Sequence, residues 1–286
     1  MKPFEYSGVF WALGSDIGGG PFLSMLDVMR SFVEQNKQKG IIPALQLAYQ
    51  NASGNFITRM DADDIMPENK LALLQNALLK KGNNFVATGL VQYFCDKEMG
   101  EGFLKYEAWL NTLTTQQNNF SEIYKECVIP SPCWMMHTTD FDKIGGFDAY
   151  AYPEDYDLCF RMYQNKLKVI GVNEICHLWR DHSRRASRND ENYSNNAFLD
   201  LKMHYFLKLD INSEKELVLW GAGKKAKQIA KILLEKKVKF IWACNNEKKI
   251  GKDIYGQLLL PFNAVKKMDR PQIIVSVAGD IPQAEI

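Results

Sequence analysis

The sequence lacks several features that mark specialised classes of protein. It has no apolar run near the roughly 18 residues that a membrane-spanning helix needs, so no transmembrane segment is predicted. Its first thirty residues hold acids and glycines instead of a basic segment followed by an apolar core, so no secretory signal is visible. None of its six cysteines forms a C-x-x-C pair, which argues against a zinc site or a disulfide framework. We therefore expect a reducing, cytoplasmic environment.

An excess of one charge is also missing. Lys and Arg number 35 and Asp and Glu 34, which gives a net charge of +1 over 286 residues. A general nucleic-acid binder would show a clear basic surplus, so we expect no nucleic-acid partner. The hydrophobic fraction of 46% and the charged fraction of 24% are ordinary for a globular chain. The length suits one large domain or two modest ones.

Helix and strand signals alternate along the chain, which predicts an α/β fold. Apolar residues at helical spacing predict four helices in the first part of the chain, from Pro21, over 43–52, from Pro67 and over 156–166. Strands are predicted over 56–60 and 85–94.

A polar stretch over 210–216 has no apolar periodicity, and we place a domain boundary there, between a domain at 1–209 and one at 210–286. The second domain is predicted to contain strands over 217–220, 239–244 and 273–277, a helix over 224–237 and a hairpin over 251–260. The chain stops soon after the last of these strands, so we expect this domain to be small or cut short.

The segment 221–226 of the second domain reads G-A-G-K-K-A, which fits the G-x-G-x-x-G/A turn that lets a backbone approach a phosphate. The next strand ends in Cys-Asn-Asn, without the acidic residue that a dinucleotide site often carries, so NAD binding is not expected. A purely structural glycine turn explains the motif equally well.

Three carboxylates, those of Asp61, Asp63 and Asp64, directly follow the strand predicted over 56–60. Ligands of open α/β sheets bind outside the carboxyl ends of strands. Carboxylates this close repel one another unless they share a cation or a proton. Hard oxygen ligands select Mg²⁺ or Mn²⁺, which in turn bind diphosphate oxygens. An isolated D-x-D is more often a solvated loop that caps the next helix.

The surroundings of this cluster resemble a known family. Residues 40–64, with G-I-I-P-A-L followed by G-N-F-I-T-R-M-D-A-D-D, look like the core of a family 2 glycosyltransferase with a GT-A fold. Residues 144–148, I-G-G-F-D, and 153–161, P-E-D-Y-D-L-C-F-R, are similar to the family's G-G-F-D…E-D-x-D-L-x-x-R stretch. The two matches stand in the family's order, about ninety residues apart, and together they are specific.

The resemblance implies an inverting, metal-dependent transfer of a sugar from a nucleoside diphosphate donor to a hydroxyl of a glycan or lipid-linked acceptor. It implies Asp63 as a direct ligand of Mn²⁺ or Mg²⁺. It places Asp61 near the donor ribose or close to the metal, and we expect Asp64 in the loop or at the helix cap. A lipid-linked acceptor leaves open a peripheral association with the inner face of the membrane.

The same resemblance places the catalytic base in Glu154-Asp155. We favour Asp155 as the base, with Glu154 contacting the acceptor or orienting the base. The amides at a helix N-terminus can fix a carboxylate but lower its pKa, so basicity must be recovered from burial or from the neighbouring carboxylate. The alternative is that these acids merely cap the helix. Asp157 and Arg161, four residues apart, are expected to form a structural pair on the helix surface.

Residues 179–188, W-R-D-H-S-R-R-A-S-R, hold four arginines and a histidine. Arginine binds phosphate oxygens bidentately and histidine can ligate divalent metals. The segment resembles the W-R-D-H-P-G-R-x-S-R stretch of one bacterial branch of the family. By that likeness His182 is a metal candidate, and Arg185 and Arg180 are diphosphate candidates. The alternative is a solvated basic loop. The remaining histidines are expected to be structural: His137, His177 and His204.

Two further segments are read through the same family. Residues 133–136 border the acceptor pocket by family likeness, or form an ordinary buried strand. Residues 249–256, K-I-G-K-D-I-Y-G, resemble a stretch of the Rossmann-like domains attached to this branch, so we expect a Rossmann-like accessory domain.

The beginning of the sequence departs from the family pattern. The D-D-G-S motif that holds the nucleotide base is missing, and if residues 9–16 are its remnant, Ala12 and Leu13 stand in place of the aspartates. We therefore expect an incomplete GT-A domain, from a fragment or a damaged gene start. Two rival hypotheses follow. One is a degenerate, non-catalytic protein that binds sugar nucleotides or a partner, and the other is a nucleotide-dependent oxidoreductase acting through the second domain.

Overall fold

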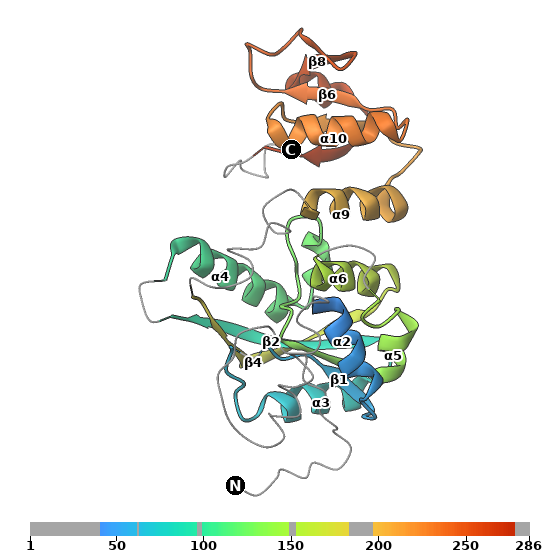
Figure 1. The fold of residues 1–286 in the computed structure, drawn as a ribbon. Coiled ribbons are helices and arrows are strands. Elements are labelled where there is room, and N and C mark those ends of the chain that lie inside the picture. The colour runs from blue at the N-terminus through green and yellow to red at the C-terminus, as the bar shows by residue number, and fades with distance from the viewer. Residues whose placement is uncertain (1–40, 62, 96–98, 149–152, 183–196, 278–286) are drawn as a thin grey trace, which may run out of the picture. The chain divides into compact units, whose positions relative to one another are not determined.

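The computed structural model describes residues 41–61, 63–95, 99–148, 153–182 and 197–277 (Figure 1). The chain divides into two compact units, one that ends at Leu201 and one that begins at Lys202. The helix predicted from Pro21 and the segment 9–16 lie outside the described residues.

The first unit is built on a four-stranded sheet with the order β1-β3-β2-β4. The central strand β3 runs antiparallel to both of its neighbours, whereas β2 and β4 pair in parallel over ten positions. A mixed sheet of this kind fits the predicted α/β class. The strands are β1 (Phe56–Thr58), β2 (Phe85–Phe94), β3 (Trp134–His137) and β4 (Lys168–Arg180).

Helices surround this sheet, and several lie where the apolar spacing predicted them. The helix predicted over 43–52 is confirmed as α2 (Ile41–Gln50), and the strand predicted over 85–94 matches β2. The helix predicted from Pro67 begins three residues later, as α3 (Lys70–Lys81). The other helices of the first unit are α4 (Glu101–Gln116), η1 (Asn119–Glu122), α5 (Thr138–Lys143) and α6 (Glu154–Gln164).

The core of the first unit forms where α3 and α4 pack against β2 and β4. Leu74 and Leu78 of α3 and Leu110 of α4 are fully buried together with Val91 of β2. Beyond the end of the short strand β3, no strand of the described residues pairs with this edge of β2, and side chains of α4 bond its backbone groups instead. Asn111 bonds both the N–H and the C=O of Val91 at 2.9 Å.

The second unit is a five-stranded sheet with the order β7-β8-β6-β5-β9. Strands β5, β6, β8 and β9 are parallel, and β7 forms an antiparallel hairpin with β8. The helix α10 connects β5 to β6, as in the expected βαβ arrangement. The bounds are β5 (Leu217–Trp220), α10 (Lys224–Glu235), β6 (Ile241–Cys244), β7 (Asp253–Ile254), β8 (Gln257–Pro261), η3 (Phe262–Lys267) and β9 (Gln272–Val275). The helix α9 (Ala197–Tyr205) and the π-helical turn η2 (Phe206–Asp210) precede them.

No helix of the described residues combines the length and the apolar character that a membrane span requires.

One glycine shows how closely α4 packs on β4. A Cβ atom on Gly171 would lie 1.9 Å from the backbone carbonyl oxygen of Thr114, a separation that no real contact allows. The strand and the helix can approach this closely only because residue 171 carries no side chain. A glycine is therefore required at position 171 by the close packing of α4 and not by the backbone conformation.

We expect Gly171→Ala to destabilise the first unit by about 1–3 kcal/mol, since a backbone must move to admit the methyl group. Gly102→Ala is the matched control, because Gly102 lies in α4 with no atom within 4 Å of its added Cβ. That control should be neutral or should gain up to about 1 kcal/mol from helix propensity. Chemical denaturation of both variants measures the difference. Equal stabilities would contradict the close approach.

Candidate functional site

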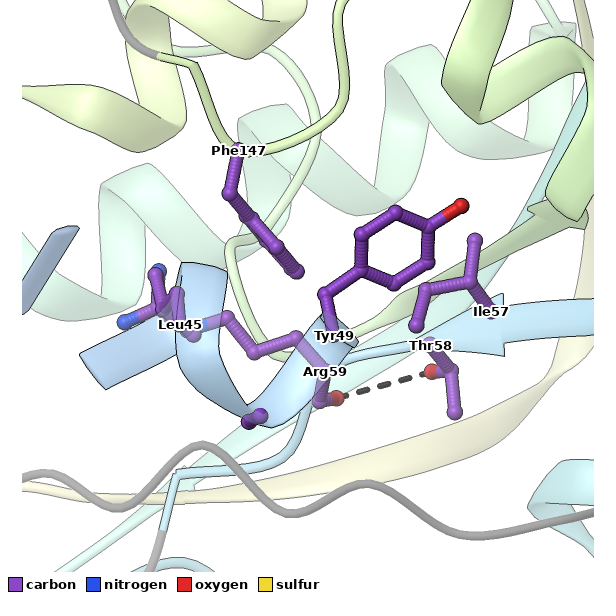
Figure 2. Close-up of a pocket in the computed structure, with 7 residues that line it drawn as sticks. Leu45, Tyr49, Ile57, Thr58, Arg59 and Phe147 are labelled. Atoms are coloured by element: carbon purple, nitrogen blue, oxygen red, sulfur yellow. Dashed lines mark hydrogen bonds between the residues drawn. The ribbon is translucent and has the colours of Figure 1, made fainter. Parts of the chain in front are cut away.

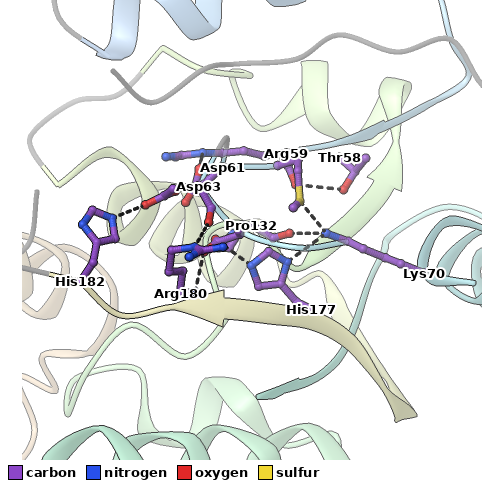
Figure 3. Close-up of polar contacts among 11 residues, drawn as sticks. Thr58, Arg59, Asp61, Asp63, Lys70, Pro132, His177, Arg180 and His182 are labelled. Atoms are coloured by element: carbon purple, nitrogen blue, oxygen red, sulfur yellow. Dashed lines mark hydrogen bonds and ion pairs between the residues drawn. The ribbon is translucent and has the colours of Figure 1, made fainter. Parts of the chain in front are cut away.

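The candidate site gathers three segments that are far apart in the sequence. They are the residues after β1 (59–61 and 63–64), the first turn of α6 (154–155) and the end of β4 with the two residues after it (180–182). Figure 3 shows the contacts between the first and the third of these segments. The structure therefore brings together most of the residues that the two motifs and the arginine-rich segment singled out. Arg185 lies outside the described residues.

The second aspartate of the D-x-D motif contacts the predicted histidine. His182 Nε2 lies 2.7 Å from Asp63 Oδ2, and the two side chains are 32% and 30% exposed. The backbone carbonyl of Asp63 accepts a hydrogen bond from Arg180 Nε at 2.9 Å. The Arg180 guanidinium also lies over the ring of Phe94, 4.7 Å from its centre. Asp63, Arg180 and His182 thus share one partly exposed rim of the site.

Asp64 lies in the loop between β1 and α3, one of the two places expected for it, and not at the helix cap. Its carboxylate accepts the backbone N–H of Arg180 at 2.8 Å and contacts Nε2 of His177 at 2.8 Å, and both side chains are almost completely buried. Residues Ile65 and Leu178 add a two-way backbone bridge beside it. The helix-cap alternative fails because Asn69 is the residue that precedes α3, and because β4 offers the Asp64 carboxylate a backbone N–H and a histidine. His177 is structural, as expected.

A lysine that the sequence analysis did not single out supports this contact. Lys70 is fully buried, and its Nζ donates to the carbonyl of Pro132 at 2.5 Å and lies 3.5 Å from Nδ1 of His177. Burial lowers the pKa of Lys70. A signal was present in the sequence, because Lys70 shares the four-residue spacing of the buried residues Leu74 and Leu78.

Arg59 joins the two acidic motifs. Its Nε donates to Asp61 Oδ1 at 3.0 Å and its Nη1 donates to Glu154 Oε1 at 2.8 Å, and its side chain is buried. Burial lowers the pKa of Arg59, but the charges of Asp61 and Glu154 outweigh it, so the net shift is upward. The residue was part of the quoted motif but was given no role there.

The acidic pair at the start of α6 is buried unevenly. Glu154 is buried, and its Oε2 has no hydrogen-bond partner among the described residues. Asp155 keeps part of its surface open to solvent, and its Oδ1 accepts the N–H of Tyr156 at 2.8 Å. Burial and the charge of Glu154 raise the pKa of Asp155 to about 7, although Arg59 and the Tyr156 amide act in the opposite direction. The carboxylate therefore changes its protonation state near neutral pH.

Asp157 and Arg161 pair as predicted, with Arg161 Nε 2.8 Å from Asp157 Oδ2, but not on the surface. Asp157 is 0% exposed, and Arg161 Nη1 also donates to the carbonyls of Ile144 and Gly146 at 2.8 Å. The surface expectation was wrong because the glycine turn of the I-G-G-F-D segment folds over this part of α6. The pair fastens that turn to the helix.

A small cavity lies behind Arg59, between α2 and β1 (Figure 2). It has room for about 10 Å³, close to one water molecule. It is lined by Leu45, Ala48, Tyr49, Ile57, Thr58, Arg59 and Phe147. A nucleotide does not fit in this space.

The other segments that the sequence analysis singled out make contacts within the fold, among the residues that the structure describes. Residues 133–136 are almost completely buried at the centre of the first sheet, which is the buried-strand alternative. In the glycine turn of the second unit, the Gly221 carbonyl accepts Trp242 Nε1 at 2.6 Å and the Ala222 carbonyl accepts Lys249 Nζ at 2.6 Å. Gly221 is required there by its φ of +128°. His137 lies in β3 and His204 in α9.

The donor set at the rim suits a hard divalent cation only in part. Among the residues that the structure describes, no three His, Cys, Asp or Glu side chains converge on one point. Asp63 and His182 offer one carboxylate and one imidazole within 2.7 Å of each other. Mg²⁺ in phosphate-binding sites is commonly held by one or two carboxylates, with substrate phosphates and water completing its coordination. The pair therefore fits a cation that a diphosphate completes.

Comparison with known proteins adds an independent result. The family model described as glycosyl transferase family 2 matches residues 26–145, a range that contains the Asp61–Asp64 cluster. None of the curated proteins matches this chain.

Similar solved structures include three crystal structures of TarS from S. aureus. The structure of TarS residues 1–349 in complex with UDP-GlcNAc has 14% identity and a TM-score of 0.43, and the match covers 72% of this chain and 59% of that one. TarS 1–349 has 15% identity and a TM-score of 0.39, with 71% and 56% covered. TarS has 15% identity and a TM-score of 0.37, with 72% and 35% covered.

The chain thus spans about a third to three fifths of the length of these structures. The resemblance drawn from the sequence motifs is confirmed by the family match, and the mixed α/β fold agrees with it. Residues 26–145 are therefore similar to the family 2 glycosyltransferases.

Proposed function

We propose that the protein transfers a sugar from a nucleoside diphosphate donor to a hydroxyl group of a glycan or lipid-linked acceptor, with inversion at the anomeric carbon. The observation that carries this proposal is the contact of Arg59 with both Asp61 and Glu154. It fastens the D-x-D motif to the acidic pair, so that groups suited to the donor and to the acceptor belong to one site.

Asp63 and His182 would hold Mn²⁺ or Mg²⁺ together with the diphosphate of the donor. Bound there, the cation would neutralise charge on the departing diphosphate. Asp61 would lie beside the donor and the cation, with its position fixed by Arg59. Arg180 would contact the diphosphate from the same rim, and we propose the same role for Arg185. The open rim suits a substrate that supplies the missing ligands.

Asp155 would act as the catalytic base. The acceptor oxygen forms a bond to the anomeric carbon while the bond from that carbon to the diphosphate oxygen breaks. The proton of the acceptor hydroxyl passes to the Asp155 carboxylate, and the products are the glycoside and the nucleoside diphosphate. A pKa of about 7 suits this task, because the carboxylate is basic enough to take a proton and is substantially ionised at neutral pH. Glu154 would orient the acceptor through its second oxygen, which has no partner among the described residues.

The second candidate function is a non-catalytic protein that binds sugar nucleotides. The missing D-D-G-S motif favours it. The two functions can be told apart by an assay, because a protein that only binds sugar nucleotides neither transfers the sugar nor hydrolyses the donor.

The donor site is tested by thermal melting with UDP, GDP, CDP and dTDP, each with and without Mn²⁺. A ligand at 100 times its dissociation constant should add about 2.7 kcal/mol to the free energy of unfolding. We expect one nucleotide to give a Mn²⁺-dependent shift, which Asp63→Ala abolishes while costing the apo protein less than about 1 kcal/mol, since this ion pair is partly exposed. Asp269→Ala, an exposed aspartate of the second unit, is the control.

The base is tested by the pH dependence of nucleoside diphosphate release from the matching sugar nucleotide, with water as the acceptor. The rate should rise with pH through about 7, because only the ionised Asp155 accepts a proton. Asp155→Asn should lower the rate by a factor of about 10² to 10⁴ and should leave the nucleotide melting shift in place.

Stability provides an independent check on the same carboxylate. The pKa of Asp155 is higher in the folded protein than in the unfolded chain, so the folded protein holds this proton more tightly. Ionisation of Asp155 therefore destabilises the folded protein as pH rises toward 7. Asp155→Asn should therefore melt higher than the native protein above pH 7 and nearly equally near pH 4. A variant that releases nucleoside diphosphate at the native rate would remove Asp155 as the base.

A further inference from the structure

The near-zero net charge of the chain conceals two units of opposite charge. Residues 202–286 contain 16 Lys and Arg against 9 Asp and Glu, a net charge of +7. Residues 1–201 contain 19 against 25, a net charge of −6. An asymmetry of this kind points to an anionic partner for the basic part of the chain.

The basic residues are ordered along α10. Its buried residues, among them Ala226, Ile229 and Leu233, form one face of the helix. Lys224, Lys227 and Lys231 follow at spacings of three and four, which places them together on the opposite face. Lys224 and Lys231 are exposed. The helix thus presents a stripe of ammonium groups away from its own sheet.

An exposed aromatic residue adjoins this stripe. The β7–β8 hairpin turns at Tyr255 and Gly256, which have φ angles of +60° and +75°. The Tyr255 ring is 45% exposed and lies 5.3 Å from Nζ of Lys231. Leu258 in the same hairpin is 55% exposed.

Tyr255 is an unusual residue for this position. A two-residue turn with both φ angles positive favours Asn, Asp or Gly, and a bulky aromatic residue there is strained. The ring stacks on Trp242, with 6.4 Å between the ring centres, and still leaves a large part of its surface open to a partner. A tyrosine ring beside lysines is the combination found where proteins meet the headgroup layer of a bilayer.

We propose that the face formed by Lys224, Lys227, Lys231 and Tyr255 docks the second unit on a membrane that contains anionic phospholipids. The lysines would attract the phosphate headgroups, and the Tyr255 ring, with Leu258 in the same hairpin, would enter the interfacial layer. A dissolved polyanion would engage the lysines but would gain nothing from exposed apolar side chains, so the hairpin favours a lipid surface. This inference does not depend on sugar transfer.

The test is co-sedimentation of the full chain with vesicles of phosphatidylcholine alone and with phosphatidylglycerol added, without nucleotide. The native protein should bind only the anionic vesicles, and added salt should weaken the binding. Replacing all three lysines by Gln should reduce the vesicle affinity on the order of 100-fold, since each lysine near the surface contributes about fivefold. The control replaces Lys80, Lys81 and Lys105, which are exposed in the first unit, and should bind as the native protein does.

Tyr255→Asn separates the lipid surface from a dissolved polyanion. Asn suits the left-handed turn, which offsets the loss of the ring contact with Trp242, so the hairpin should stay folded while binding to anionic vesicles falls. Polyphosphate in solution should compete only weakly. The proposal would be overturned if the native protein bound neither vesicle type. It would also be overturned if replacing the three lysines of α10 and replacing the three control lysines reduced binding equally. Unchanged binding of Tyr255→Asn together with full competition by polyphosphate would assign the face to a dissolved polyanion instead.

Discussion

The candidate site depends on one buried guanidinium. Arg59 directly follows β1, and its buried guanidinium bonds the carboxylates of both Asp61 and Glu154. Without this cation, two carboxylates would be left together in a region of low polarity, where each is costly unless paired. The same cation opposes the rise in the pKa of Asp155 that burial and Glu154 produce. Arg59 thus holds the D-x-D motif in position and moderates the basicity of the proposed base.

A second buried group supports the rim of the site. Lys70, His177 and Asp64 form a connected polar cluster, and Asp64 in turn fixes the backbone of Arg180. The residues proposed to meet the donor, Asp63 and His182, stay about one third exposed on this frame. Buried polar networks rigidify their surroundings when their members are satisfied. The rim can therefore remain open to a substrate while its backbone is held in place.

Much of this arrangement could be predicted from the sequence, because local patterns carry it. Strand β2 and helix α2 followed from apolar spacing, and the D-x-D and E-D motifs named their residues directly. Contacts between distant segments could not be predicted in this way. The contact of Asp64 with β4 and the link from Arg59 to Glu154 depend on how distant segments pack together, and β4 received no prediction at all. The burial of Asp157 was missed for the same reason, since helical spacing alone does not show what covers a helix.

The central claim, that Arg59 joins the two acidic motifs into one site, is tested most directly by a double-mutant cycle. The free energy of unfolding would be measured by chemical denaturation for the native protein, Arg59→Met, Glu154→Gln and the double variant. A direct buried contact predicts that the double variant loses less than the sum of the single losses, with a coupling of about 1–3 kcal/mol. Additive losses, within about 0.5 kcal/mol, would contradict the account.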